Sequence, residues 1–223
     1  MTREAAPVEA APPRVEPLPP VQRVAEVAAP ASIRPPVGQA MPGNLAAFVD
    51  WLGQDFQPEA AWHGPLFLPP VQEHARLLVL CEMPDDGADE GGLPFTMPAA
   101  RLVTAMLAAI GLDAGAIGFA PLATRRPPGG HLDESTFDTL AGRTRHYLAL
   151  VRPQAVLILG DRTSRALVAA QDGGAVKGLP EIHHAGGIVP AAAFAGPELL
   201  MRRPIAKAAS WQTLRLLHGI LNA

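Results

Sequence analysis

Charged side chains of opposite sign gather in two loops in the middle of the chain. Residues 82–97 form a glycine-rich stretch whose acidic members are Glu82, Asp85, Asp86, Asp89 and Glu90. Carboxylates in such a loop can bind a cation weakly or stay solvated, and for the four from Asp85 onward we favour solvation. Residues 124–131 carry Arg125 and Arg126. Arginine suits phosphate because its planar guanidinium offers paired donors, so the second loop could contact a phosphate backbone.

The two halves of the chain differ in charge. Residues 1–100 hold 5 Lys/Arg and 13 Asp/Glu, a net charge of −8, whereas residues 101–223 hold 13 and 8, a net charge of +5. Eleven of the 13 basic residues in the second half are arginines, which favours phosphate contact. The isoelectric point of about 6.1 argues against a strong general affinity for nucleic acid.

The composition also excludes several kinds of site. A single cysteine, Cys81, excludes an intrachain disulfide and any metal site built mainly from thiolates. No run approaches the roughly 20 apolar residues that span a bilayer, and the first residues lack the apolar stretch of a signal peptide. We therefore expect a cytoplasmic monomer with no membrane contact, no bound metal and no cofactor.

Proline separates the chain into a tail and a folded domain. Residues 1–43 hold ten of the 25 prolines and no aromatic residue, which predicts a disordered Pro/Ala-rich tail. This tail could bind a protein partner or simply aid solubility. Asn44 is a plausible N-cap for the helical pattern that follows, so we place the domain at residues 44–223.

Short apolar runs alternate with helical patterns through the domain. The runs at 76–81, 117–122, 155–160 and 187–194 predict buried strands. Helices are predicted at 98–110, 133–151, 161–170 and 204–221, the last with Trp211, Leu214, Leu217 and Leu221 facing inward. Such alternation predicts a three-layer α/β/α fold with a central four-stranded parallel sheet. Its ligand site should lie at the carboxyl ends of the strands.

Several blocks at these strand ends share the order of a known enzyme family. They are Cys81-Glu82-Met83-Pro84 followed by Asp89, Gly92, Pro94 and Phe95; residues 106–112; Arg126-Pro127-Pro128-Gly129; Arg165-Ala166-Leu167; and Pro197, Leu200, Arg202, Pro204, Lys207 and Trp211. Nearly without gaps, they resemble the motifs of the family 4 uracil-DNA glycosylases. The resemblance covers about residues 44–223 and implies a uracil-DNA glycosylase-like fold, a DNA-repair lineage and hydrolysis of an N-glycosidic bond.

This chain departs from that family at three kinds of position. The family binds a four-iron cluster through four cysteines, two before the first strand and the others at positions that match Arg125 and Ala141 or Gly142 here. Its asparagine that reads the uracil edge falls on or near Pro121. Its histidine before Pro197 falls on Gly196, or on Ala195 if the register slips by one. The resemblance therefore implies a degenerate site without an iron–sulfur cluster.

The same resemblance assigns roles to the residues that remain. Glu82 would be the catalytic acidic residue of the first motif, and Phe95 would stack the flipped base, with Met83, Pro84, Gly196 and Pro197 around it. Contacts to DNA would fall on the arginines of the loop and of the C-terminal segment, which are Arg125, Arg126, Arg202 and Arg203.

Three functions remain open at this point. The first is a degenerate glycosylase domain that binds single-stranded or uracil-containing DNA with lost or much reduced excision. The second is an active DNA glycosylase with rebuilt catalytic residues, for which His131 and the pair His183-His184 are weak candidates. The third is an α/β interaction scaffold that does not meet DNA. A flipped base is identified by hydrogen bonds to its pairing edge, so the missing asparagine and histidine favour the first.

Overall fold

Five strands form one mixed sheet in the computed structural model, which describes residues 40–89, 92–168 and 178–223. The strands are β1 (Leu77–Cys81), β2 (Ile117–Pro121), β3 (Ala155–Leu159), β4 (Glu181–His184) and β5 (Gly187–Phe194), in the order β2-β1-β3-β5-β4. The first three and β5 run parallel, and β4 runs antiparallel to β5. Almost all of the predicted tail lies outside the described residues.

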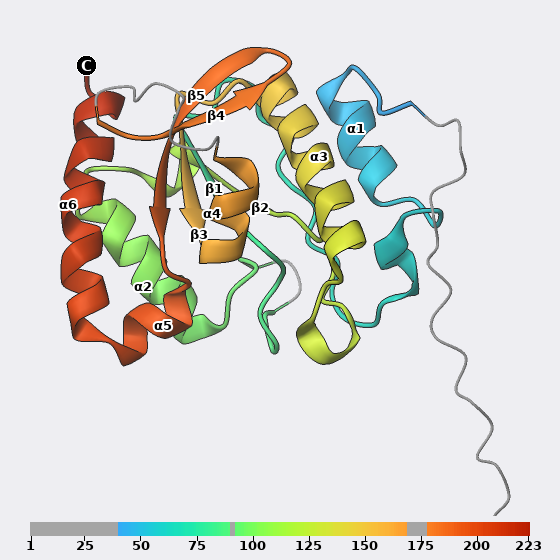
Figure 1. Ribbon diagram of the computed structural model, residues 1–223, viewed down its shortest axis with the longest axis horizontal. Helices are drawn as coiled ribbons and strands as arrows, with labels where there is room; N and C mark the ends of the chain where they lie inside the picture. The colour runs from blue at the N-terminus through green and yellow to red at the C-terminus, as the bar shows by residue number, and fades with distance from the viewer. Residues whose placement is uncertain (1–39, 90–91, 169–177) are drawn as a thin grey trace, which may run out of the picture. The chain divides into compact units, whose positions relative to one another are not determined.

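Helices cover both faces of this sheet (Figure 1). One face packs against α1 (Leu45–Leu52), α3 (Glu134–Val151) and α4 (Asp161–Leu167), and the other packs against α2 (Met97–Ala108), α5 (Pro197–Arg202) and α6 (Pro204–Leu221). Short 3₁₀ turns lie at η1 (Pro58–Ala61), η2 (Ala114–Ala116) and η3 (Pro128–Gly130). The mixed α/β class is confirmed, with a separate apolar core on each face of the sheet.

The prediction of four strands was wrong by one. The predicted strand at 187–194 is β5, but β4 pairs with it through a tight turn and forms an additional, antiparallel edge. Only Glu181 and Ile182 of β4 are buried, so the segment has no apolar run of its own. It is a strand because β5 supplies its hydrogen-bond partners.

The predicted cap Asn44 and the predicted start of the helix at 133–151 agree with the structure more closely than the predicted inward face of α6 does. The Asn44 side chain accepts from the Ala47 N–H, and Asp133 accepts from the Thr136 N–H, which satisfies donors at both helix starts. The stripe predicted for α6 was partly wrong, because Trp211 is 45% exposed. Ser210 takes the inward position instead, since residues 210, 214, 217 and 221 share one helical face.

No helix among the described residues has the length and apolar character needed to cross a membrane.

Candidate functional site

Four parallel strands end side by side at one edge of the sheet, which we name the carboxyl edge. The register pairs Cys81 at the end of β1 with Pro121 of β2 and with Leu159 of β3, and Leu159 with Phe194 of β5. The loops that follow these strands therefore start from adjacent points. Ligands of open α/β sheets bind in this position, so it is the first candidate for the site.

Glu82 stands directly after β1 and is held by an arginine that the sequence analysis did not select. Arg162 Nη1 lies 3.0 Å from Glu82 Oε1, and Nη2 lies 3.0 Å from Glu134 Oε2. Arg162 also donates to the Leu132 carbonyl, and its guanidinium lies 4.0 Å from the centre of the Phe137 ring. The carboxylate of Glu82 is thus fixed by one cation, which links the end of β1 and the start of α4 to the start of α3.

The rest of the first motif is more buried than a base-binding surface requires. Pro84 is buried and its carbonyl accepts from Arg126 Nη1 at 3.0 Å, while Met83 is partly buried. Phe95 is only 4% exposed, and its ring packs edge to face on Phe119 with centroids 6.1 Å apart. A base could stack on this ring only after the covering residues moved, so the stacking role stays a prediction.

The positions matched to the two missing donors lie at the carboxyl edge. Pro121 is the buried last residue of β2, which is an edge strand of the sheet. Proline is tolerated there because an edge strand has a neighbour on one side only, so the missing N–H costs few hydrogen bonds between strands. Gly196 is the N-cap of α5 and precedes the buried Pro197. A Cβ added to Gly196 would meet no atom within 4 Å, so space for a side chain exists there.

The four arginines predicted to contact DNA form two groups. Arg125 donates to the Gly64 carbonyl and Arg126 to the Pro84 carbonyl, so both are partly engaged in holding loops. Arg202 pairs with Glu198 at 2.6 Å on exposed surface, and Arg203 is also exposed. The second pair is therefore the more accessible of the two.

Asp85 is less solvated than its place in an acidic loop predicted. Its Oδ2 accepts from the Thr96 N–H at 3.0 Å, and its own N–H donates to the Pro94 carbonyl. Burial raises the pKa of Asp85, while the Thr96 hydrogen bond and the Arg126 charge lower it and Glu198 raises it. The prediction that these carboxylates stay solvated was therefore only partly right for Asp85, while Asp86 and Asp89 are exposed and Glu90 lies outside the described residues.

We expect Asp85→Asn to stabilise the protein at neutral pH. An acid whose folded-state pKa is raised destabilises the fold once it ionises, so the cost is absent well below the unfolded pKa of 3.8 and present above the folded pKa. The gain should not exceed about 1 kcal/mol, because solvent screens a half-buried carboxyl. Urea unfolding at pH 8 and at pH 4 should show a gain that shrinks at the lower pH, with Asp86→Asn unchanged as the control.

The candidate pair His183-His184 does not reach the carboxyl edge, whereas His131 is exposed directly after η3, in the loop that follows β2. His183 and His184 lie on β4, and His184 pairs with Gly187, the first residue of β5. The pair therefore lies where β5 begins, at the end of the sheet opposite the carboxyl edge. The Glu181 carboxylate is 3.7 Å from His183, and burial lowers the pKa of His184. The hypothesis that this pair reaches over the strand ends was wrong, because the hairpin directs it away. The alternative of an exposed loop pair was partly wrong, since both residues lie on β4 and only His183 is exposed.

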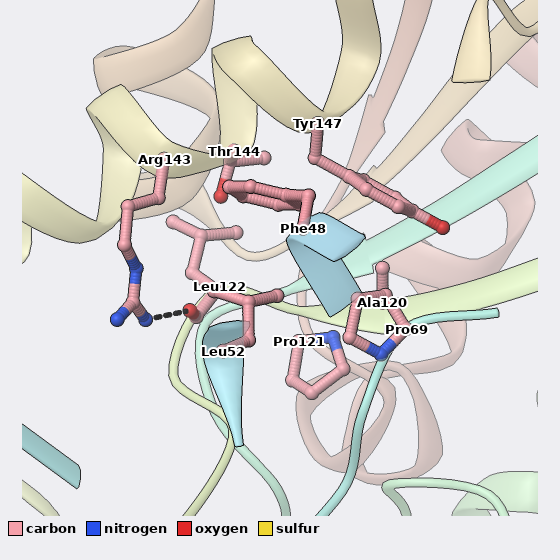
Figure 2. A pocket seen from close by; sticks show the side chains of 9 residues that line it. All are labelled: Phe48, Leu52, Pro69, Ala120, Pro121, Leu122, Arg143, Thr144 and Tyr147. Carbon is pink, nitrogen blue, oxygen red and sulfur yellow. Dashed lines mark hydrogen bonds between the residues drawn. The ribbon is translucent and has the colours of Figure 1, made fainter. Parts of the chain in front are cut away.

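A small pocket lies on the opposite face of the sheet from Phe95. Its lining consists of Phe48, Leu52, Pro69, Ala120, Pro121, Leu122, Arg143, Thr144 and Tyr147 (Figure 2). The lining has no carboxylate and no histidine. The Tyr147 hydroxyl donates to the Pro70 carbonyl at 2.7 Å, and burial raises its pKa, so it stays protonated. The pocket offers no general acid or base, and the carboxyl edge remains the candidate site.

The residues present do not fit the iron–sulfur cluster that the resemblance implies. The chain has one cysteine, and Cys81 lies inside β1, where burial and the charges of Asp85 and Glu82 raise the pKa of its thiol. Arg125, Ala141 and Gly142 cannot supply thiolates. Among the described residues, no group of three histidine, cysteine or acidic side chains is placed to hold a metal ion.

Comparison with known protein families agrees with this fold. The family model described as "Uracil DNA glycosylase superfamily" matches residues 69–215, which is well over half of the chain and includes β1 to β5 and most of α6. No curated protein matches the chain. The match begins after α1, although α1 packs into the same core. The chain therefore belongs to the uracil DNA glycosylase superfamily.

Proposed function

We propose that this protein binds DNA but has lost most of the uracil-excising activity of its superfamily, as a degenerate relative of the family 4 branch without a cluster. The observation that carries the proposal is the presence of Pro121 at the end of β2 and of Gly196 two residues after the end of β5. Neither residue has a side-chain donor for the oxygens of a flipped base. Loss of one preorganised donor costs about 10²–10³ in rate, so loss of both leaves little excision.

Support for DNA binding comes from the corner between α5 and α6. Exposed apolar and basic side chains lie together there, and they are Leu199, Met201, Arg202, Arg203 and Ile205, the last 87% exposed. Arginines can neutralise phosphates, and exposed apolar side chains can insert beside bases. The corner follows β5 directly, so it adjoins the carboxyl edge.

One assay tests this proposal. Purified full-length protein is incubated with single- and double-stranded DNA that contains uracil, and each sample is read by gel shift and by alkaline cleavage at abasic sites. The expected result is a shift without cleavage. A protein that neither shifts nor cleaves DNA would favour the third function, an interaction scaffold.

We expect the double variant Arg202→Ala/Arg203→Ala to weaken binding of single-stranded DNA. Two lost phosphate contacts should lower the slope of log affinity against log salt by about 1.4. The matched control is Arg165→Ala/Arg215→Ala, whose arginines are also exposed. Arg165 lies on the last turn of α4, and Arg215 lies on the C-terminal half of α6, whose end contacts Arg76 just before β1. Both positions are away from the corner between α5 and α6. Titrations at several salt concentrations check this, and equal slopes in both variants would contradict it.

A second candidate function rests on Asp85. A half-buried carboxyl with a raised pKa, beside Arg126 and Glu198, is typical of functional sites. Such a group could serve in a glycosylase whose chemistry has been rebuilt for uracil or another damaged base. Abasic sites in the assay above, absent with Asp85→Asn, would favour this candidate over the first.

A further inference from the structure

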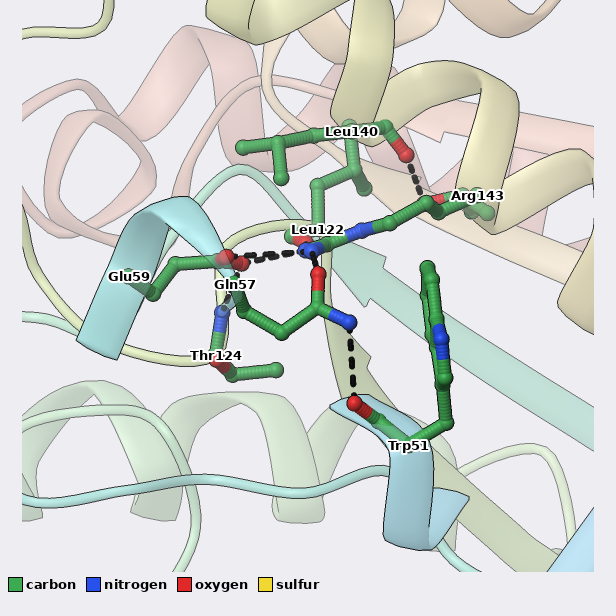
Figure 3. A network of polar contacts seen from close by, with 8 residues as sticks. Trp51, Gln57, Glu59, Leu122, Thr124, Leu140 and Arg143 are labelled. Carbon is green, nitrogen blue, oxygen red and sulfur yellow. Dashed lines mark hydrogen bonds and ion pairs between the residues drawn. The ribbon is translucent and has the colours of Figure 1, made fainter. Parts of the chain in front are cut away.

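Three segments that are distant in sequence meet at a buried polar network, which we name the Glu59 clasp. Its side chains are those of Gln57, the N-cap of η1, of Glu59 in η1, and of Arg143 in α3 (Figure 3). All three residues are at most 5% exposed. It also includes the backbone of Leu122 and Thr124, in the loop after β2. Buried charges are costly unless they are paired and hydrogen-bonded, so this network must be nearly complete to be tolerated.

The hydrogen bonds of the clasp connect all three segments. Arg143 donates to both carboxylate oxygens of Glu59, to Gln57 Oε1 at 2.7 Å and to the Leu122 carbonyl. Glu59 Oε1 accepts in addition from the Thr124 N–H at 3.3 Å. Gln57 Nε2 donates to the Trp51 carbonyl at 2.8 Å, which extends the network to α1. Each terminal nitrogen of the guanidinium thus has a partner.

The clasp holds the loop from which Arg125 and Arg126 project. Its two backbone contacts, at Leu122 and Thr124, flank a single residue, and the two arginines follow at once. Arg126 then reaches the Pro84 carbonyl of the first motif. The Glu59–Arg143 ion pair is therefore connected to the carboxyl edge through only the few backbone residues from Leu122 to Arg126.

The same three segments contain or adjoin the positions at which the resembling family has its cluster cysteines, and this chain has no cysteine at any of them. Gln57 and Glu59 lie before β1, Thr124 is next to Arg125, and Arg143 is next to Gly142. We propose that the Glu59–Arg143 ion pair joins these segments in place of a metal cluster, and that both residues are positioning residues for the Arg125–Arg126 loop. The part concerning DNA rests on the proposed function, and the part concerning the joining of the segments does not.

The joining role is tested by a double-mutant cycle on the full chain. Glu59→Gln and Arg143→Met each leave one buried charge without its partner, so each should lower the folding equilibrium constant by about 10²- to 10³-fold. The double variant removes both charges and should lose much less than the product of the two. Additive losses, or single losses below about tenfold, would overturn the proposal. Added chelator should not change the wild-type unfolding curve.

A milder variant covers the case in which the single variants do not fold. Arg143→Lys keeps the charge but not the planar fork. Its Thr124 amide should exchange hydrogen faster than in the wild type, because Glu59 is no longer held to accept from it. Unchanged protection at Thr124 would overturn the clasp. If the single variants fail to fold and the double variant folds, the coupling is established directly.

The positioning role needs a control that is equally destabilised elsewhere. Leu107 is fully buried on α2, on the other face of the sheet, and Leu107→Ala should cost a comparable amount of stability. With both variants folded by circular dichroism, Glu59→Gln should weaken DNA binding and Leu107→Ala should not. Equal binding by both would reject the positioning role. If the wild type binds no DNA, the proposed function fails, while the unfolding and exchange results still decide the clasp.

Discussion

Replacement of Phe48 by alanine is expected to lower the free energy of unfolding by about 3–5 kcal/mol, the usual cost of truncating a buried phenylalanine. Phe48 is fully buried on α1. Its ring lies against Trp51 at 5.6 Å, His146 at 5.1 Å and Tyr147 at 6.2 Å between centroids. It therefore joins α1 to α3, and its loss leaves a cavity that three aromatic neighbours cannot easily fill.

This prediction decides whether α1 belongs to the folded domain. The superfamily match starts at residue 69, whereas α1 ends at Leu52. Urea unfolding followed by circular dichroism measures the change, and Val71→Ala, which truncates an exposed side chain, should change stability by less than about 0.5 kcal/mol. A loss below about 1 kcal/mol for Phe48→Ala would mean that α1 frays independently of the sheet.

Buried strands and capped helices could be predicted because their signals are local. Residues 77–81 and 155–159 are apolar throughout, and both strands are buried at every position. Asn44 and Asp133 carry the oxygen that a first helical turn needs. In contrast, β4 depends on its partner β5, and no window of its own sequence contains that information.

The site could be predicted only where single positions carry it. Glu82 and the arginine loop follow strands, so topology alone brings them to the carboxyl edge. Arg162 was missed because its partner Glu82 lies 80 residues away, and Arg143 because Glu59 lies 84 residues away. Ion pairs between distant segments leave no spacing pattern. The raised pKa of Asp85 has the same origin, since burial is a tertiary property.

The double variant Gly196→His/Pro121→Asn is expected to excise uracil faster than the unmodified protein. A histidine at position 196 would have space, since a Cβ there meets nothing within 4 Å and the backbone φ of −56° suits any residue. An asparagine at position 121 would end an edge strand opposite Cys81, the residue before Glu82. Each donor contributes about 10²–10³ in rate, so the double variant should exceed either single one by about two orders of magnitude.

Single-turnover excision from single-stranded DNA, read by alkaline cleavage, measures this gain. Gly219→His adds the same side chain to open space on the C-terminal half of α6 and should give none. Adding Glu82→Ala to the double variant should abolish the gain, because the carboxylate that Arg162 holds at this edge would be gone. If the unmodified protein already excises uracil at a comparable rate and Glu82→Ala abolishes it, then the chemistry has been rebuilt around the existing carboxylates and Gly196 is not a lost catalytic position.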